Sequence, residues 1–159
     1  MTLLAIDGGD KNVGYALFDQ STGEEIERGI IPFDDFFSKF EIADYDDGRG
    51  NRLMFDDYSH QIEQLVVEGY RHDPNVKQGG SVHGASQVEG AVKILGRVAE
   101  VRVTVQYAGQ ALPVAKQITG YIGDLTKTGN KKHLPDQDSA WLHGIFWLHC
   151  NDVDWRQWI

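Results

Sequence analysis

The sequence predicts an α/β protein with a central mixed sheet, an antiparallel three-strand meander plus parallel strands, flanked by helices. The first sign is an unbroken apolar run at residues 3–6, which has strand length and no polar alternation. Such a run is typical of a strand that is buried on both faces. The second sign is a later strand pattern preceded by a helical one, which implies a crossover connection. The 159 residues fit a single domain spanning 1–159.

The three strands of the meander follow one another closely. Residues 3–6 lead into Asp7 and two glycines, and a second apolar stretch follows at 15–18. This order of strand, carboxylate, glycine turn and strand indicates a hairpin. Residues 26–31 predict the third strand, which Pro32 ends.

The middle of the chain combines several patterns. The phenylalanines of residues 33–40 predict a short helix, and the acidic run at 44–47 predicts a solvated loop. Residues 52–65 carry apolar side chains at helical spacing, which predicts an amphipathic helix. A short buried strand at 65–68 follows and ends at Glu68. We expect this strand to lie parallel to the first, because a helix joining two strands forms a crossover.

The second half alternates between loops and regular elements. We expect a loop at 70–81, a helix at 83–99, a strand at 101–107, a polar glycine-punctuated stretch at 108–135 and a final helix at 138–150. The last nine residues fit a short turn or a partner-binding strip equally well.

Composition narrows the class of protein. No apolar run is long enough to cross a bilayer, and no basic region precedes the first apolar run, so we expect neither a membrane partner nor a signal peptide. The lone Cys150 excludes an internal disulfide and a four-cysteine zinc site, and favours the cytoplasm. A formal charge of -9 argues against a general nucleic-acid binder. Positive charge is nevertheless locally concentrated in the 108–135 stretch, at Lys116, Lys127, Lys131 and Lys132.

Four acidic residues come from distant parts of the chain. Asp7 and Glu68 end strands that we expect to be parallel neighbours, and Asp136 and Asp138 stand at the start of the last helix. A helix packed on the sheet can bring its first turn over both strand ends. Carboxylates gathered in this way repel one another unless cations lie between them. Oxygen ligands favour Mg²⁺ or Mn²⁺, and two such ions can cleave a phosphodiester.

Each of these acids also has a structural interpretation. Asp7 is as well suited to starting a turn as to binding a ligand, and Glu68 fits an ordinary exposed strand end. Asp136 and Asp138 fit helix caps. His143 fits a packing or surface histidine better than a proton relay or phosphate contact. The joint occurrence of the acids, more than any single one, favours an active site.

Several blocks of sequence resemble the RuvC-like Holliday-junction resolvases of the ribonuclease H-like superfamily. They are, in family order, LLAIDGGDKNVGYALFD, LVVEGYR, GASQVEGAVKILGRVAEV and QYAGQALPVAKQITGYIGDLTKTGNKKHLPDQDSAWLHGIFWLHC. The resemblance covers most of the chain except residues 33–51. It implies a ribonuclease H-like fold and an endonuclease that resolves four-way DNA by symmetric nicks, leaving 5′-phosphate and 3′-hydroxyl ends. The small acidic chain suits a phage-type resolvase acting in the host cytoplasm.

The resemblance also implies roles for the acids. Asp7 would bridge two Mg²⁺ ions, with Mn²⁺ as a substitute, Glu68 would bind one of them, and Asp136 or Asp138 the other. The family carries two acids near the start of this helix, followed by a small residue. Aligning that small residue with Ala140 places Asp136 at the position of the first acid and Ser139 at the position of the second. Aligning the helix end instead favours Asp138, with Trp141 at the second position, so both aspartates stay candidates. Asp10 fits a turn residue better than a peripheral ligand.

DNA contacts and assembly follow from the same resemblance. Tyr70 or Arg71 would stack at the junction centre. The four lysines of the 108–135 stretch would bind phosphates. The helix at 83–99 would form the face of a homodimer, since two symmetric nicks need two active sites. No nucleotide cofactor is expected.

Two other functions compete with this interpretation. The first hairpin also resembles the phosphate-binding hairpin of actin-like or sugar-kinase-type ATP-binding modules, although the chain is short for their two lobes. A catalytically inactive domain that binds branched DNA is the other, because one acid of the last motif is displaced.

Overall fold

The computed structural model describes residues 1–44, 50–57, 59–70, 81–121 and 134–158. Within them seven strands form one sheet: β1 (Thr2–Gly8), β2 (Asn12–Asp19), β3 (Glu25–Pro32), β4 (Phe40–Asp44), β5 (Asn51–Phe55), β6 (His60–Glu68) and β7 (Arg102–Gln106). The helices are α1 (Phe33–Phe36), α2 (Ser81–Val98), α3 (Ala108–Thr119) and α4 (Asp136–Cys150), with short 3₁₀ turns η1 (Phe37–Lys39) and η2 (Arg156–Trp158).

The centre of the sheet agrees with the prediction. β1 pairs antiparallel with β2, and β2 pairs antiparallel with β3, which makes the expected meander. On its other side β1 pairs in parallel with β6, with Ile6 opposite Val67. This pair lies one residue before Asp7 and Glu68, so the two acids stand at the same edge of the sheet, where both strands end.

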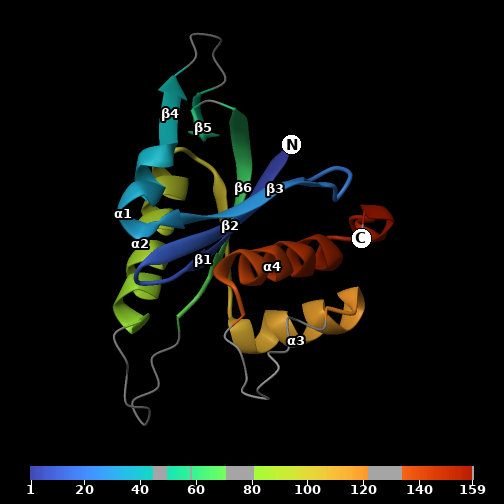
Figure 1. Cartoon of the computed structure of the whole chain (residues 1–159). Coiled ribbons are helices and arrows are strands. Elements are labelled where there is room, and N and C mark those ends of the chain that lie inside the picture. Colours follow the sequence, from blue (N-terminus) through green and yellow to red (C-terminus); the bar gives the residue numbers. More distant parts are fainter. Residues whose placement is uncertain (45–49, 58, 71–80, 122–133, 159) are drawn as a thin grey trace.

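β6 has two partners along a single edge. Its first residues pair antiparallel with β5, and its second half, from Gln64 onward, pairs in parallel with β7. The β4–β5 hairpin thus joins the sheet at the start of β6, where Figure 1 shows it extending beyond the other strands.

The predicted helix over residues 52–65 is wrong, because this segment forms the end of the β4–β5 hairpin and most of β6. Asp56 and Asp57 both have positive φ angles, of 54° and 51°, and the Ser59 amide donates to the Asp56 carbonyl at 3.0 Å. This turn reverses the chain between β5 and β6. The parallel pairing of β6 with β1 was predicted correctly, but the element before β6 is a strand.

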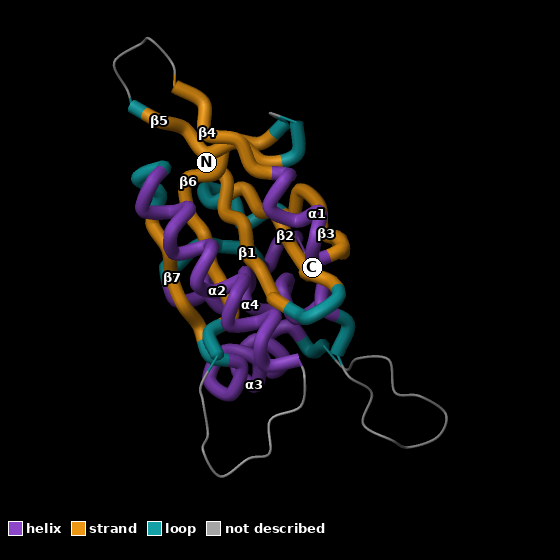
Figure 2. Tube along the Cα trace, turned by 90° about the vertical axis from the view of Figure 1, so that its left-hand side faces the viewer, coloured by secondary structure: helices purple, strands orange, loops and turns teal. Residues whose placement is uncertain are grey.

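Helices cover both faces of the sheet (Figures 1 and 2). α4 lies across one face, with α3 packed against it, and α2 lies on the other face. β1 contributes alternate side chains to the two cores: Leu3 and Ala5 pack on the α4 side, Leu4 and Ile6 on the α2 side. All four are fully buried. A two-sided core explains why this strand shows no polar alternation in sequence.

Other boundaries differ from the predicted ones. Residues 108–119 form α3, although we expected a polar, glycine-punctuated stretch without a helix at 108–135. The short phenylalanine helix is present as α1, but Phe40 starts strand β4. Asp44 is the exposed end of that strand, and the rest of the acidic run lies outside the described residues. α4 begins at Asp136, two residues earlier than expected.

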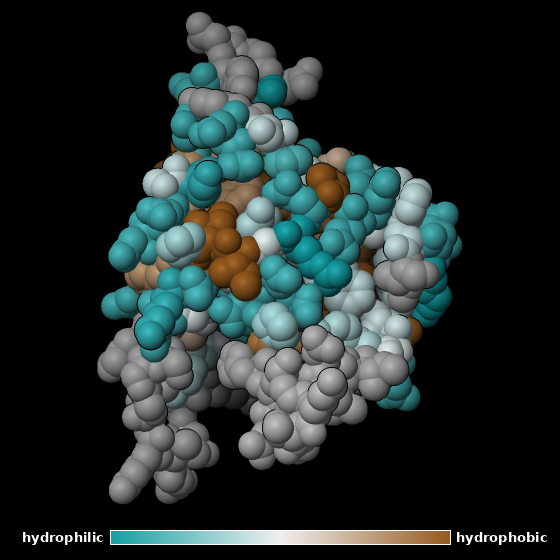
Figure 3. Space-filling model, viewed as in Figure 1, coloured by the Kyte–Doolittle hydropathy of each residue, from teal (hydrophilic) through white to brown (hydrophobic). Residues whose placement is uncertain are grey.

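The surface drawn in Figure 3 is mainly hydrophilic, with separate apolar patches. In the described part of the chain, no helix combines the length and the apolar character needed to span a membrane.

Candidate active site

A cavity of about 580 Å³ lies at the sheet edge where β1 and β6 end. Asp7 and Glu68 line it from these two strands, and Asp136 and Ser139 line it from the first turn of α4. The parallel register of β1 and β6 brings the two strand acids together. Three acids that are far apart in sequence therefore surround one cavity, as the sequence predicted.

Glycines let α4 approach the first hairpin closely. A Cβ atom at Gly14 of β2 would lie 2.1 Å from the carbonyl carbon of Asp136, which is too near for any side chain. A Cβ atom at Gly9, in the β1–β2 turn, would lie 3.7 Å from Oδ2 of Asp136. The helix backbone thus rests directly on β2, and the Asp136 carboxylate lies beside the turn that follows Asp7.

Asp7 and Glu68 behave as a coupled pair. Burial, followed by the charge of Glu68 and a hydrogen bond with it, raises the pKa of Asp7 to about 9, and Asp136 adds to the rise. Burial also acts to raise the pKa of Glu68, but hydrogen bonds with His143 and Asp7 and the charge of His143 together lower it. Ser139 hydrogen-bonds to both carboxyl groups. Without a cation, the pair holds one proton, on Asp7.

His143 supports Glu68 from inside the protein. Its imidazole has no exposed surface, and Nε2 lies 3.3 Å from Oε2 of Glu68. On the other side of the ring, Nδ1 lies 2.9 Å from Oε1 of Gln106, at the end of β7. The histidine is therefore neither a surface residue nor an isolated packing residue. Its contact with Gln106 joins α4 to β7, and its Nε2 lies beside the Glu68 carboxylate.

Asp138 is placed away from the cavity. Its Oδ2 accepts a hydrogen bond from the Tyr121 hydroxyl at 2.7 Å, and its Oδ1 lies 3.3 Å from Nη1 of Arg28 on β3. The structure thus separates the two helix aspartates that the sequence left as equal candidates: only Asp136 lines the cavity.

The donor set suits a hard divalent cation in its chemistry, because carboxylates and a hydroxyl offer only oxygen atoms. A proton held between two partly buried carboxyl groups, here on Asp7, also marks a place that a cation can occupy. Within the described ranges, however, no three acidic, histidine or cysteine side chains are close enough together to surround one ion. Metal binding would therefore need the Asp136 side chain to move relative to the Asp7–Glu68 pair.

The other predicted site residues fall into three groups. Tyr70 lines the cavity, and its amide donates to Oε2 of Glu89 at 2.9 Å. Asp10 also lines it, but its Oδ1 accepts a hydrogen bond from the Gly84 amide of α2 at 2.8 Å, which fits the turn role. Lys116 lies one helical turn beyond Leu112, which is a lining residue of α3. The remaining candidates lie outside the described residues: Arg71, Lys127, Lys131 and Lys132.

Sequence reasoning missed two members of the site. Gln106 ends a strand that pairs with β6, so its register opposite Glu68 becomes visible only once that pairing is known. Lys11 lines the cavity from the β1–β2 turn, and its place in that turn, directly before β2, gave the only hint.

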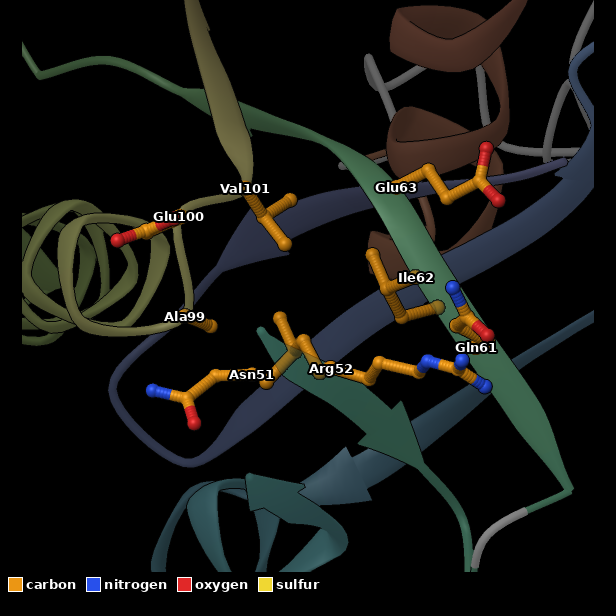
Figure 4. A pocket seen from close by; sticks show the side chains of 9 residues that line it. Asn51, Arg52, Gln61, Ile62, Glu63, Ala99, Glu100 and Val101 are labelled. Atoms are coloured by element: carbon orange, nitrogen blue, oxygen red, sulfur yellow. The ribbon is translucent and has the colours of Figure 1, made fainter. Parts of the chain in front are cut away.

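A second pocket of about 450 Å³ lies at the other end of β6, beside the start of β5 and the turn between α2 and β7. Figure 4 shows its two acidic residues, Glu63 and Glu100, pointing away from one another. This pocket therefore offers no convergent carboxylates, unlike the cavity at Asp7.

Comparison with solved structures identifies similar folds. The structure of RuvC from Thermus thermophilus, alone and in complex with a Holliday junction substrate, matches with a TM-score of 0.52 and 12% identity over 96% of both chains. The fowlpox virus Holliday junction resolvase matches with a TM-score of 0.49 and 15% identity over 95% of this chain and 99% of that one. No protein-family model and no curated protein sequence matches the chain. The RuvC likeness confirms the predicted ribonuclease H-like fold.

Proposed function

From this RuvC-like fold and its acidic cavity, we propose that the protein is a metal-dependent endonuclease that cleaves branched DNA. The observation that carries the proposal is the meeting of Asp7, Glu68 and Asp136, from two strands and one helix, around one cavity. A structural neighbour with the same fold was solved with a Holliday junction. We take the four-way junction as the substrate, with symmetric nicks that leave 5′-phosphate and 3′-hydroxyl ends.

The residues present would hold divalent cations, two per site, as Mg²⁺ or Mn²⁺. Bound ions of this kind supply an acidified water molecule and stabilise the charge on the leaving 3′ oxygen. Asp7 must lose its proton before it can act as a ligand, since burial beside Glu68 keeps it protonated. Glu68 lies beside the buried His143, and Asp136 approaches from the helix side.

DNA binding would involve the rim of the cavity and the lysines beyond it. Tyr70 lines the cavity and would stack on an unpaired base, or Arg71, assigned from the sequence alone, would do so. Lys116 continues the face of α3 that lines the cavity, so a DNA backbone that enters the cavity passes near it. We assign Lys127, Lys131 and Lys132 the same phosphate-binding role from the sequence alone. Such contacts offset the overall negative charge locally.

We also propose that α2 forms the face of a homodimer, which would supply two active sites for two nicks. Ile94 and Val98 are one turn apart on its outer surface and are 67% and 53% exposed. Apolar side chains this exposed on a helix suit a self-complementary interface. The double variant Ile94→Glu/Val98→Glu should convert a dimer to a monomer in light scattering. A wild-type protein that is already monomeric at micromolar concentration would contradict the dimer.

The function is tested with a labelled four-way junction, a fork and an RNA–DNA hybrid duplex, each incubated with Mg²⁺. We expect paired nicks in the junction from the wild type and none from Asp7→Asn at matched concentration. Equal cleavage of all three substrates would leave a nuclease but defeat the junction assignment.

One observation favours an inactive DNA-binding domain as the second candidate. In the described parts of the chain no three potential ligands are grouped closely enough to hold a metal. Junction binding without nicking, in Mg²⁺ and in Mn²⁺, would favour this alternative.

A further inference from the structure

Lys11 is the one cationic side chain among the described residues that line the acidic cavity. Four acids share the lining with it: Asp7, Asp10, Glu68 and Asp136. A phosphate group entering this cavity meets a strongly negative surface, and a lysine at the same place attracts the phosphate that the acids repel. Among the lysines that the structure describes, Lys11 is therefore the one that lines this cavity.

The backbone around Lys11 is held at several points. The Gly9 amide donates to the Asn12 carbonyl at 3.0 Å, which closes the turn that contains Lys11. The Lys11 carbonyl accepts a hydrogen bond from the Phe33 amide at 2.9 Å. All these groups belong to the main chain, so replacing the Lys11 side chain leaves them in place.

The carboxylate of the neighbouring Asp10 does not pair with the Lys11 ammonium group. Oδ1 of Asp10 accepts the Gly84 amide hydrogen, and a Cβ atom at Gly84 would lie 2.5 Å from the Cα atom of Asp10. The close approach of α2 thus holds the Asp10 side chain on the α2 side of the turn. In the described chain no carboxylate forms an ion pair with Lys11, which is an exposed residue.

We propose that Lys11 binds a non-bridging oxygen of the phosphate that is cleaved. This inference rests on the proposed nuclease function and adds a substrate-contacting residue to it. Charge on the phosphoryl oxygens changes as the nucleophile attacks, and an ammonium group carried by a held turn at the cavity stabilises that charge. The lysine then contributes mainly to the chemical step, whereas lysines away from the cavity contribute to binding.

The test compares Lys11→Gln and Lys11→Arg with Lys39→Gln in steady-state nicking of a four-way junction. Lys39 is a matched control, because it loses the same charge but pairs with Asp56 at 3.2 Å and does not line the cavity. We expect Lys11→Gln to lower kcat about tenfold or more while KM changes by less than about threefold. Lys11→Arg, which keeps the charge, should recover most of the activity. Melting temperatures should match the wild type, because the turn uses main-chain hydrogen bonds.

Two results would overturn the inference. One is a Lys11→Gln variant whose kcat stays within about twofold of the wild type, since a contact to the reacting phosphate must affect the chemical step. The other is a Lys11→Gln variant in which KM rises and kcat does not change. That result would assign Lys11 to general phosphate binding. Failure of the nuclease proposal is distinguishable, because then the wild type itself leaves every branched substrate intact.

Discussion

The Tyr121 hydroxyl donates a hydrogen bond of 2.7 Å to the Asp138 carboxylate, and so links the chain after α3 to the first turn of α4. Arg28 of β3 meets the same carboxylate and lies over the ring of Trp141, 5.2 Å from its centroid. Three separate elements are thus joined at Asp138. The effect is to fix the start of α4, where Asp136 and Ser139 line the cavity.

The two helix aspartates should therefore respond differently to the same substitution. We expect Asp136→Asn to abolish nicking with little change in stability. Asp138→Asn should retain nicking within a few-fold and lower the free energy of unfolding by about 1 kcal/mol, the typical contribution of one hydrogen bond. Junction cleavage and urea unfolding measure the two effects. A reversal of the two activities would return Asp138 to the list of metal ligands.

Asp7→Asn tests the pKa of the buried acid. The folded protein keeps a proton on Asp7 up to about pH 9, far above the ordinary value of 3.8. The stability gained from that proton is complete below the unfolded pKa and is lost as pH rises through about 9. In EDTA, the melting temperature of the asparagine variant should exceed that of the wild type by a margin that grows from pH 5 to pH 9. Parallel curves would show that Asp7 is ionised at neutral pH.

The same proton competes with metal binding. Because Asp7 must be deprotonated to act as a ligand, the apparent affinity for Mn²⁺ should rise with pH across the neutral range and level off near pH 9. Calorimetric titration of the wild type at several pH values gives this dependence, and Asp7→Asn is the control. An affinity independent of pH would contradict a protonated Asp7.

Gly14→Ala should damage both the fold and the site. The added methyl group would overlap the backbone of Asp136, so α4 has to move away from β2. Such overpacking costs about 1–3 kcal/mol. We expect weaker metal binding as well, because Asp136 moves with the helix. Gly109→Ala is the matched control, since a Cβ atom there meets nothing within 4 Å. Wild-type stability in Gly14→Ala would show that the contact is looser than described.

The contact between His143 and Gln106 suits a double-mutant cycle. Either single change, His143→Leu or Gln106→Leu, leaves a buried polar group without its partner, at a cost of about 1–3 kcal/mol. The double variant should lose less stability than the sum of the two single variants. Additive losses, measured by urea unfolding, would mean that the two side chains do not interact.

Much of the fold was predictable because the strongest local signals agree with the tertiary structure. The run at 3–6 is apolar because helices cover both faces of β1. The helix predicted for 52–65 failed because its apolar stripe comes from two strands: Phe55 ends β5, and Ile62 and Leu65 lie on either side of a register irregularity in β6. The turn between the two strands depends on the positive φ angles of Asp56 and Asp57. An aspartate in a sequence does not by itself reveal whether its φ angle is positive. α3 was missed because Pro113 and Gly109 disfavour helix locally, while burial of Ala111 and Ala115 stabilises it.

The candidate site was predictable as a set of acids but not as a geometry. Asp7 and Glu68 meet because β1 and β6 are parallel neighbours, which the sequence analysis predicted. The choice between Asp136 and Asp138 depends on how α4 rotates about its axis, which contacts with Gly14, Tyr121 and Arg28 determine. The contacts with Gly14 and Arg28 join segments more than a hundred residues apart, and none of the three contacts leaves a local pattern in the sequence.

Because β6 pairs with β5 at its start and with β7 at its end, the β4–β5 hairpin and the acidic cavity lie at opposite ends of this strand. The β4–β5 hairpin joins only the first residues of that strand, and the acidic cavity is built on its last. The hairpin is consequently a part that insertions, tags or fused modules can enlarge without disturbing the chemistry.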